Sequence, residues 1–289
     1  MKYSYWALCF FLAGLTACQP GTSGPDGETT LERIKRTGVV RVGYANEAPY
    51  AYMDSASNRL TGEAPEIIRY VMKTLGVTEV KGVLTEFGAL IPGLKANRFD
   101  VIAAGMYVTP ERCTQIAFSN PTYTIGEAFV VAEGNPMDLH SFEGVASHDS
   151  ARLGVMAGAV EHGYAKKLNV PLDRIVVFPD NISGLDGVRA GRIDAFAATD
   201  LTIQDLMGKT TDGAIEQAAP FTDPVIDGVS VKGYGAFGFR PEDQSLVTGV
   251  NEILTEFIGS DAHSKLVSPF GFTAANLPGT VTAAELCGR

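Results

Sequence analysis

The chain has 289 residues, of which 45% are hydrophobic and 19% are charged, a composition typical of globular proteins. This length is sufficient for two compact domains. The formal net charge of -10 argues against a nucleic-acid-binding protein, because no broad basic surface is available to neutralise phosphates.

The N-terminal segment is typical of an export signal. Its apolar run, at residues 5–14, is too short to span a bilayer and leads into the sequence Leu-Thr-Ala-Cys at 15–18. This sequence resembles the lipobox of bacterial lipoproteins, in which the signal is cut before a cysteine that becomes acylated. We therefore expect a lipoprotein signal peptide at 1–17, lipidation of Cys18, a flexible tether at 18–30 and a lipid-anchored periplasmic protein. The alternative is an ordinary signal peptide with a chance cysteine.

Helices and strands are expected to alternate along the rest of the chain. Apolar residues recur at helical spacing in some segments, and short β-branched runs separate them. This alternation predicts an α/β architecture with a largely parallel sheet. The expected elements are a helix at 31–37, a strand at 39–44, a helix at 65–75, a strand at 80–84, a helix at 89–96 and a strand at 101–104.

An internal repeat predicts two lobes built on similar plans. The sequence GLKANRFDVIAA at 93–104 recurs as GVRAGRIDAFAA at 187–198. Loop-like segments at 118–126 and 220–235 are expected to cross between the lobes, and a helix at 244–258 would return to the first lobe. Two crossovers form a hinge, and a hinge between two α/β lobes makes a cleft. The expected boundaries are 31–122 with 234–289 for lobe 1, and 123–233 for lobe 2 with the hinge crossovers.

Two cysteines remain in the mature chain if Cys9 and Cys18 belong to the export signal. In an oxidising compartment, Cys113 and Cys287 suggest a disulfide that holds the C-terminal tail. Two unrelated buried thiols are the alternative. The sequence has no Cys-x-x-Cys motif and its four histidines are scattered, so we expect no metal site and no cofactor.

Arg112 gives the strongest chemical signal among the segments that follow predicted strands, where ligands of open parallel sheets bind. Thr109 and Pro110 form a good N-cap and first helical position, so Arg112 is expected in the first turn of a helix that begins at the cleft. A guanidinium beside unpaired backbone N–H groups suits a bound carboxylate. An ion pair with a surface acid such as Glu111 is the alternative.

Other segments at strand ends complete the candidate site. Residues 158–160 offer backbone donors at a helix start in the second lobe. The remaining candidates there are one acid and three aromatic residues: Glu47, Tyr50, Phe87 and Tyr107. The alternative interpretation of each is an exposed acid or an aromatic residue of the core.

These features, in this order, resemble the amino-acid-type periplasmic solute-binding proteins of ABC importers. The resemblance covers nearly the whole mature chain and is carried by residues 31–43, 87–94, 105–112 and 260–265. It implies a two-lobed type II periplasmic-binding-protein fold, a monomer without catalytic residues, and permease and ATPase partners. It also implies that Arg112 holds a ligand carboxylate, with Gly105, Thr109 and backbone donors around Val160 in the same site.

The second copy of the repeat departs from that family's pattern. An acid that ends the motif Asp-Ala-x-x-x-Asp normally takes the α-ammonium group, but Thr199 stands at that place here and Asp200 follows it. Residues 46–50, 62–67, 84–88 and 105–113 look instead like the ectoine- and hydroxyectoine-binding proteins. That resemblance implies that Glu47 meets the protonated ring nitrogens, inside an aromatic cage of Tyr50, Phe87 and Tyr107.

Two other functions stay open at this point. One is a polar amino-acid-binding protein of an ABC importer. The other comes from cyclohexadienyl dehydratases, which share the fold, and it would make Glu47 or Asp200 a general acid. The sequence offers no nucleophile–base pair, metal set or phosphate loop, so the prediction is a binding protein and not an enzyme.

Overall fold

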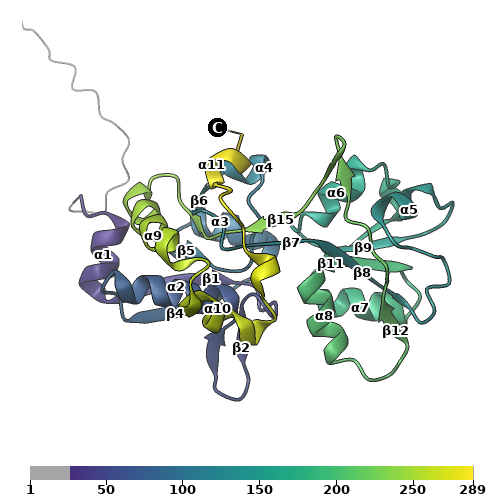
Figure 1. Cartoon of the computed structure of the whole chain (residues 1–289), viewed down its shortest axis with the longest axis horizontal. Helices are drawn as coiled ribbons and strands as arrows, with labels where there is room; N and C mark the ends of the chain where they lie inside the picture. The colour runs from purple at the N-terminus through teal and green to yellow at the C-terminus, as the bar shows by residue number, and fades with distance from the viewer. Residues whose placement is uncertain (1–26, 289) are drawn as a thin grey trace, which may run out of the picture.

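The computed structural model describes residues 27–288. The expected signal peptide, the expected lipidation site Cys18 and most of the expected tether lie outside this range. The described residues form two α/β lobes that lie side by side (Figure 1). Each lobe is built on one five-stranded sheet, which confirms the predicted two-lobed α/β architecture.

The first lobe has a mostly parallel sheet. Its valine-rich strand β1 pairs in parallel with β4 and β5, whereas β16 runs antiparallel to β5 and β6. Helices α2 (Glu63–Thr74) and α9 (Gln244–Phe257) pack on one face through buried apolar residues, and α3 (Leu90–Lys95) packs on the other. In sheet order the strands are β4 (Glu79–Leu84), β1 (Val39–Tyr44), β5 (Val101–Ile102), β16 (Gly238–Phe239) and β6 (Ala117–Phe118).

The helices of the first lobe come from both ends of the chain. In Figure 1 the yellow-green C-terminal helices lie over the same lobe as the purple and blue N-terminal ones. Helix α10 packs against α2, and α1 packs against α9. These helices are α1 (Thr30–Thr37), α2 (Glu63–Thr74), α3 (Leu90–Lys95), α4 (Pro110–Cys113), α9 (Gln244–Phe257), α10 (Asp261–Val267) and α11 (Ala283–Leu286).

The second lobe repeats this plan. Strands β10, β9 and β11 are parallel, and β8 runs antiparallel to both β11 and β12. Helices α5 and α6 cover one face of the sheet, and α7 and α8 cover the other. In sheet order the strands are β10 (Ile175–Phe178), β9 (Leu153–Met156), β11 (Ala195–Thr199), β8 (Glu127–Ala132) and β12 (Ile215–Gln217). The helices are α5 (Phe142–Ser147), α6 (Glu161–Lys167), α7 (Asn181–Arg189) and α8 (Asp200–Gly208).

Two short strands connect the lobes. Strand β7 (Tyr123–Ile125) pairs antiparallel with β15 (Gly233–Gly235), and both lie between the lobes in Figure 1. The second crossing segment was expected to be a loop, but it also contains a hairpin of β13 (Val225–Ile226) and β14 (Val229–Ser230). A second hairpin, of β2 (Tyr52–Asp54) and β3 (Arg59–Thr61), leads into α2.

Several elements differ in length from their predictions, for local reasons. The helix expected at 65–75 begins two residues earlier, because backbone carbonyls of Pro49 and Tyr50 accept from its first N–H groups. The helix expected at 89–96 begins as a 3-10 turn at Phe87. The strand expected at 101–104 ends at Ile102, since the chain turns at Gly105, whose φ is 66°.

The repeated sequence has the same structure in both lobes. Each copy contains an aspartate, just before its strand, that holds the start of a neighbouring parallel strand. The carboxylate of Asp100 accepts from the backbone N–H of Arg41 at 3.0 Å, and that of Asp194 accepts from the backbone N–H of Arg152 at 2.8 Å. The guanidinium group of each arginine also donates to the same carboxylate. The repeat is therefore one strand-connecting unit used twice.

The C-terminal segment is tied to α4. Cys113 and Cys287 form a disulfide in the structure, with Cα atoms 5.7 Å apart. Within residues 27–288, no helix combines the length and apolar character needed to cross a membrane. The same residues contain no cluster of three or more His, Cys, Asp or Glu side chains arranged to hold a metal ion.

Candidate functional site

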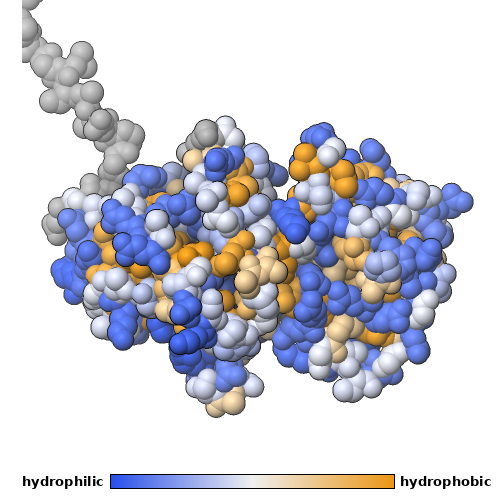
Figure 2. Space-filling model, in the orientation of Figure 1, coloured by the Kyte–Doolittle hydropathy of each residue, from blue (hydrophilic) through white to orange (hydrophobic). Residues whose placement is uncertain are grey.

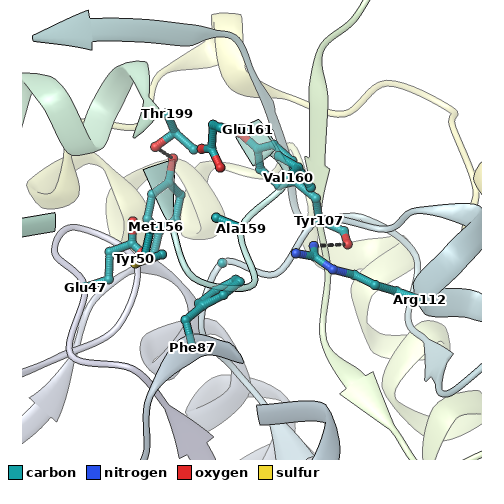
Figure 3. A pocket seen from close by; sticks show the side chains of 11 residues that line it. Glu47, Tyr50, Phe87, Tyr107, Arg112, Met156, Ala159, Val160, Glu161 and Thr199 are labelled. Carbon is teal, nitrogen blue, oxygen red and sulfur yellow. Dashed lines mark hydrogen bonds between the residues drawn. The ribbon is translucent and has the colours of Figure 1, made fainter. Parts of the chain in front are cut away.

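A small cavity lies between the two lobes, beyond the carboxyl ends of the central strands. About 310 Å³ of its space is not filled by protein atoms. Both lobes contribute to its walls, as Figure 3 shows. The lining residues are Glu47, Tyr50, Phe87, Gly105, Tyr107, Arg112, Met156, Ala159, Val160, Glu161 and Thr199.

Arg112 enters the cavity from α4, which begins as the sequence predicts. The Thr109 hydroxyl caps the helix by accepting from the Arg112 backbone N–H at 3.2 Å, and Pro110 occupies the first turn. The guanidinium lies 5.7 Å from the centroid of the Phe87 ring. Burial lowers the pKa of Arg112, and the negative charge of Glu161 acts in the opposite direction. A guanidinium remains charged under these conditions, so the cavity has one fixed cation.

Two N–H groups of Arg112 already donate to main-chain carbonyls. Nη1 donates to the carbonyl of Tyr107 at 2.7 Å, and Nη2 donates to that of Gly158, in the second lobe, at 2.9 Å. A guanidinium has five N–H donors, so these bonds orient the group and leave donors for a ligand carboxylate.

Glu47 lies on the opposite side of the cavity from Arg112 (Figure 3). Its backbone exchanges two hydrogen bonds with Ala51, both of 2.8 Å, which fixes the loop that follows β1. Its carboxylate accepts from Asn181 Nδ2 at 2.9 Å and from Thr202 Oγ1 at 3.1 Å, both in the second lobe. Burial raises the pKa of Glu47, whereas these two hydrogen bonds lower it. The carboxylate is thus held by neutral donors, and no ion pair joins it to a cation among residues 27–288.

Three aromatic side chains line the space between these charges. Tyr50, Phe87 and Tyr107 are each less than 8% exposed. The Tyr50 hydroxyl donates to Thr199 Oγ1 at 2.8 Å, and its ring packs 5.2 Å from that of Tyr123. A Cβ atom at Gly105 would lie 2.6 Å from the Tyr50 ring, so only glycine allows this ring position.

The lobes are in direct contact around the cavity. Arg112 and Tyr50 donate to second-lobe groups, Glu47 accepts from two others, and the main chains of the two lobes meet at Gly88 and Gly158. A Cβ atom built on Gly158 would lie 2.6 Å from the Cα atom of Gly88. The structure is therefore a closed arrangement, in which first-lobe side chains bond to second-lobe groups.

The structure brings eight of the nine predicted binding residues into the cavity wall. The ninth, Thr109, is not among the lining residues and acts on the site through the cap of α4. Asp200, the acid one step beyond Thr199, accepts from Gln204 and Gln217 at 2.9 Å each and does not line the cavity. Gly158 contributes a carbonyl acceptor for Arg112 rather than a donor in this arrangement.

Met156 and Ala159, which also line the cavity, belong to the strand-end segment that contains Val160. Sequence reasoning missed three other residues of the site: Glu161 lines the cavity, and Asn181 and Thr202 bind Glu47. Asn181 follows the end of β10, so the strand-end rule could have found it. Glu161 gave no signal, because an acid in the first turn of a helix is ordinary.

Glu161 belongs to a buried pair of acids. Glu161 and Glu127 are each 4% exposed. Burial is the main cause that raises the pKa of each, and repulsion between the two carboxyl groups raises that of Glu127 further. The pKa of Glu161 reaches about 7. A cavity with a single arginine thus has two acids in its wall and a third beside them.

A wider groove adjoins the cavity on the other side of Arg112. It is open to solvent, holds about 1530 Å³ and runs between α4 and α6. On the face drawn in Figure 2, a notch separates the two lobes in this region. Lys166, Lys167 and His162 line its second-lobe side.

Comparisons with known proteins agree with this architecture. Residues 40–272 match the sequence profile of the bacterial extracellular solute-binding proteins, family 3. The chain is 38% identical to a protein of Sinorhizobium fredii named as a probable amino-acid ABC transporter periplasmic-binding protein, over 91% of this chain and 87% of that one.

Solved structures give the same result. EhuB in complex with hydroxyectoine superimposes with a TM-score of 0.80 and 35% identity, covering 89% of this chain and 97% of that one. An ancestral amino acid-binding protein, described as a precursor of cyclohexadienyl dehydratase, superimposes with a TM-score of 0.70 and 25% identity, covering 84% and 99%. The predicted type II periplasmic-binding-protein fold is confirmed.

Proposed function

This chain belongs to family 3 of the bacterial extracellular solute-binding proteins, and from that premise we propose that it captures ectoine or hydroxyectoine for an ABC importer. The similarity to EhuB bound to hydroxyectoine supports the ligand class. The name of the Sinorhizobium relative supports the transporter class. Permease and ATPase subunits would be the partners of the ligand-bound form.

The observation that carries the proposal is the placement of opposite charges among aromatic rings in one cavity. Arg112 and Glu47 line opposite sides, with Tyr50, Phe87 and Tyr107 also in the wall. Ectoine is a cyclic zwitterion whose positive charge is spread over an amidine. Its carboxylate would bind Arg112 and its ring nitrogens would donate to Glu47. Aromatic faces attract such a delocalised cation by up to about 2 kcal/mol each when water is excluded.

The second-lobe residues favour a ligand whose positive charge is on a ring over a ligand with an α-ammonium group. Thr199, not an acid, follows the second copy of the repeat, and its hydroxyl accepts from Tyr50. Asp200 is engaged by two glutamines of its own lobe. An α-ammonium group at this position would therefore find a hydroxyl where it needs a carboxylate.

Ligand capture is proposed to proceed by lobe closure. The open form would bind the solute on the first lobe through Arg112, Glu47 and the aromatic rings, and the second lobe would then engage. We assign residues 31–122 and 234–289 to lobe 1 and 123–233 to lobe 2, with β7 and β15 at the hinge. The solute shifts the equilibrium because it contacts both lobes only in the closed form.

The same proposal extends to location and assembly. Export, cleavage before Cys18 and acylation of its thiol would place a monomer on the membrane surface, with residues 18–30 as its tether. Family membership supports an extracytoplasmic location.

A polar amino acid is the second candidate ligand. The name of the Sinorhizobium relative favours it, and so does Glu161, an additional acid in the cavity wall that could take an ammonium group. A dehydratase is not favoured by any contact in the site, although the ancestral protein shows that the fold is shared with a precursor of such an enzyme.

Calorimetric titration of the purified protein with ectoine, hydroxyectoine and a panel of α-amino acids tests the proposal. Arg112→Ala is expected to weaken ectoine binding by about 2–5 kcal/mol, because a ligand carboxylate would lose its buried partner. Arg98→Ala is the matched control, since Arg98 is an exposed arginine of the same lobe that does not line the cavity. Tight binding of a common α-amino acid, with no heat from either ectoine, would overturn the proposal.

A further inference from the structure

Tyr123 lies directly behind the aromatic wall of the cavity. It is the first residue of β7, one of the two strands that cross between the lobes, and it is 2% exposed. Its ring centroid lies 5.2 Å from that of Tyr50 and 6.3 Å from that of Tyr107. Both of those rings line the cavity, whereas Tyr123 does not. A residue of a crossing strand therefore packs against two residues of the binding site.

The hydroxyl group of Tyr123 holds the turn at Gly105. It donates to the Gly105 carbonyl oxygen at 2.9 Å. Gly105 lines the cavity, and its φ of 66° turns the chain after β5. Burial raises the pKa of Tyr123 well above its ordinary value, so the hydroxyl keeps its proton and remains a donor. This bond fixes the start of the segment that leads to Tyr107 and Arg112.

The second crossing strand, β15, holds the same segment through its main chain. Residues 106–108 form two backbone hydrogen bonds with β15 and the residue after it, of 2.9 and 3.0 Å. Between these bonds, Tyr107 and Gly235 form an antiparallel bridge. The Tyr107 carbonyl also accepts from Arg112, so the main chain that orients the guanidinium is itself held by a crossing strand.

Two glycines of β15 make room for the tyrosine rings. Gly233 and Gly235 are two residues apart in the strand, so side chains at these positions would be on the same face. A Cβ atom at Gly233 would overlap the ring of Tyr107, and one at Gly235, which pairs with Tyr123 across the ladder, would overlap the ring of Tyr123. The absence of both side chains allows the two rings to pack against the crossing strand.

The C-terminal part of the chain supports Tyr123 from another direction. Phe272 is 4% exposed, and its ring makes edge contacts with Tyr123 and Tyr50, with centroids 5.1 and 5.7 Å apart. Further along, Asn276 Nδ2 donates to the carbonyl of Thr124, the residue that follows Tyr123 in β7, at 3.4 Å. Tyr123 is therefore held between the cavity wall, β15 and the C-terminal segment.

We propose that Tyr123 is a positioning residue through which the crossing strands hold the aromatic wall of the cavity in its binding arrangement. The inference rests on the proposed solute-binding function, although not on which solute is bound. In lobe closure, movement of β7 would reach Tyr50 and Tyr107 through the ring of Tyr123, and would reach Gly105 through its hydroxyl group. Tyr123 would thus act through its neighbours, without contact with the solute.

Calorimetric titration of variants with ectoine and hydroxyectoine tests this role. Tyr123→Phe keeps the ring and loses the bond to Gly105, so it is expected to weaken binding about fivefold. Tyr123→Leu also loses the ring contacts and should weaken binding by more than about tenfold. Gly235→Ala displaces the ring from the β15 side and should resemble the leucine variant. Tyr44→Phe, at a buried tyrosine of the same lobe outside the cavity wall, is the matched control and should bind like the wild type.

Hydrogen exchange on the solute-free protein separates positioning from a general loss of packing. In Tyr123→Phe the amides of residues 105–108 should exchange faster, while those of β1 keep the wild-type rate. Unchanged exchange at 105–108, equally faster exchange at β1, or wild-type affinity in Tyr123→Leu would overturn the inference. If the leucine variant does not fold, wild-type affinity in both Tyr123→Phe and Gly235→Ala has the same meaning. If the wild type binds neither ectoine nor hydroxyectoine, the proposed function fails, and the exchange rates still decide the role of Tyr123.

Discussion

The two copies of the repeated unit differ in how strongly their aspartates are held. Asp100, in the first lobe, is fully buried and forms ion pairs with Arg33, Arg41 and Arg240. Asp194, in the second lobe, is partly exposed and pairs with Arg152 alone within the described residues. The geometry of the unit is the same, but the first copy joins three separate parts of the chain and the second joins two neighbouring strands.

The two lobes also differ in the chemical groups that they contribute to the cavity. The first lobe supplies one cationic and one anionic side chain, Arg112 and Glu47, from segments that follow its strands. The second lobe supplies mainly hydroxyl, amide and carbonyl groups that bond to those side chains. The first lobe thus positions Arg112 and Glu47, and groups of the second lobe bond to them.

The largest expected effect comes from removing the two aspartate charges separately. Asp100→Asn should lower the free energy of unfolding by about 3–5 kcal/mol, because three arginines lose a buried partner. Asp194→Asn should cost about 1 kcal/mol, since its partner is accessible to water. Urea denaturation of both variants measures the difference. Equal losses would show that the two units contribute equally.

A smaller effect is expected from the disulfide, which exists only in the first lobe. Replacing Cys113 and Cys287 together by serine should destabilise the protein by about 2–4 kcal/mol, because the bond closes a loop across most of the chain. Thermal unfolding with and without a reductant provides the measurement. If the wild type unfolds at the same temperature in both conditions, the bond does not stabilise the first lobe.

The smallest effect concerns Glu63, which connects α2 of the first lobe to the crossing segment. Thr122 Oγ1 donates to its carboxyl group at 2.7 Å, and burial raises the pKa of Glu63 to about 8. Because this value lies above the unfolded one of 4.5, the folded state retains the proton. The stability contribution is complete below the unfolded pKa and is lost as the pH rises through the folded one.

Raising the pH from 5 to 7 should therefore cost about 2 kcal/mol of unfolding free energy through Glu63. Glu63→Gln removes the titrating group and should unfold with a weaker dependence on pH over this range. Urea denaturation of both proteins at the two pH values gives the comparison. Parallel pH profiles would show that Glu63 does not hold a proton in the folded state.

The parts of the fold that follow from local sequence were predictable. The repeat predicted two lobes of similar plan, because each copy includes its own helix end, turn and strand. Thr109 and Pro110 gave the helix start that positions Arg112, since capping depends on residues only three apart. Glu47 and the three aromatic residues were candidates from their place among segments at strand ends, and the resemblance of short segments supplied the role expected of each.

The contacts that cross the cavity were not predictable from the sequence. Asn181 and Thr202 reach Glu47 over more than 130 residues of chain, and their distance depends on how far the lobes close. The pairing of Glu127 with Glu161 joins β8 to the first turn of α6, and neither residue has an unusual sequence context. Long-range geometry, not residue type, defines this part of the site.

In the proposed lobe closure, the contact between Gly88 and Gly158 would act as a mechanical stop. Main chain meets main chain there, without a flexible side chain to yield, so the movement would end at one fixed angle. Every solute small enough to let the lobes reach that stop would produce the same outer shape. A membrane partner that recognises this outer shape would bind the ligand-loaded form whatever the solute is. The side chains inside the cavity would determine which solute binds.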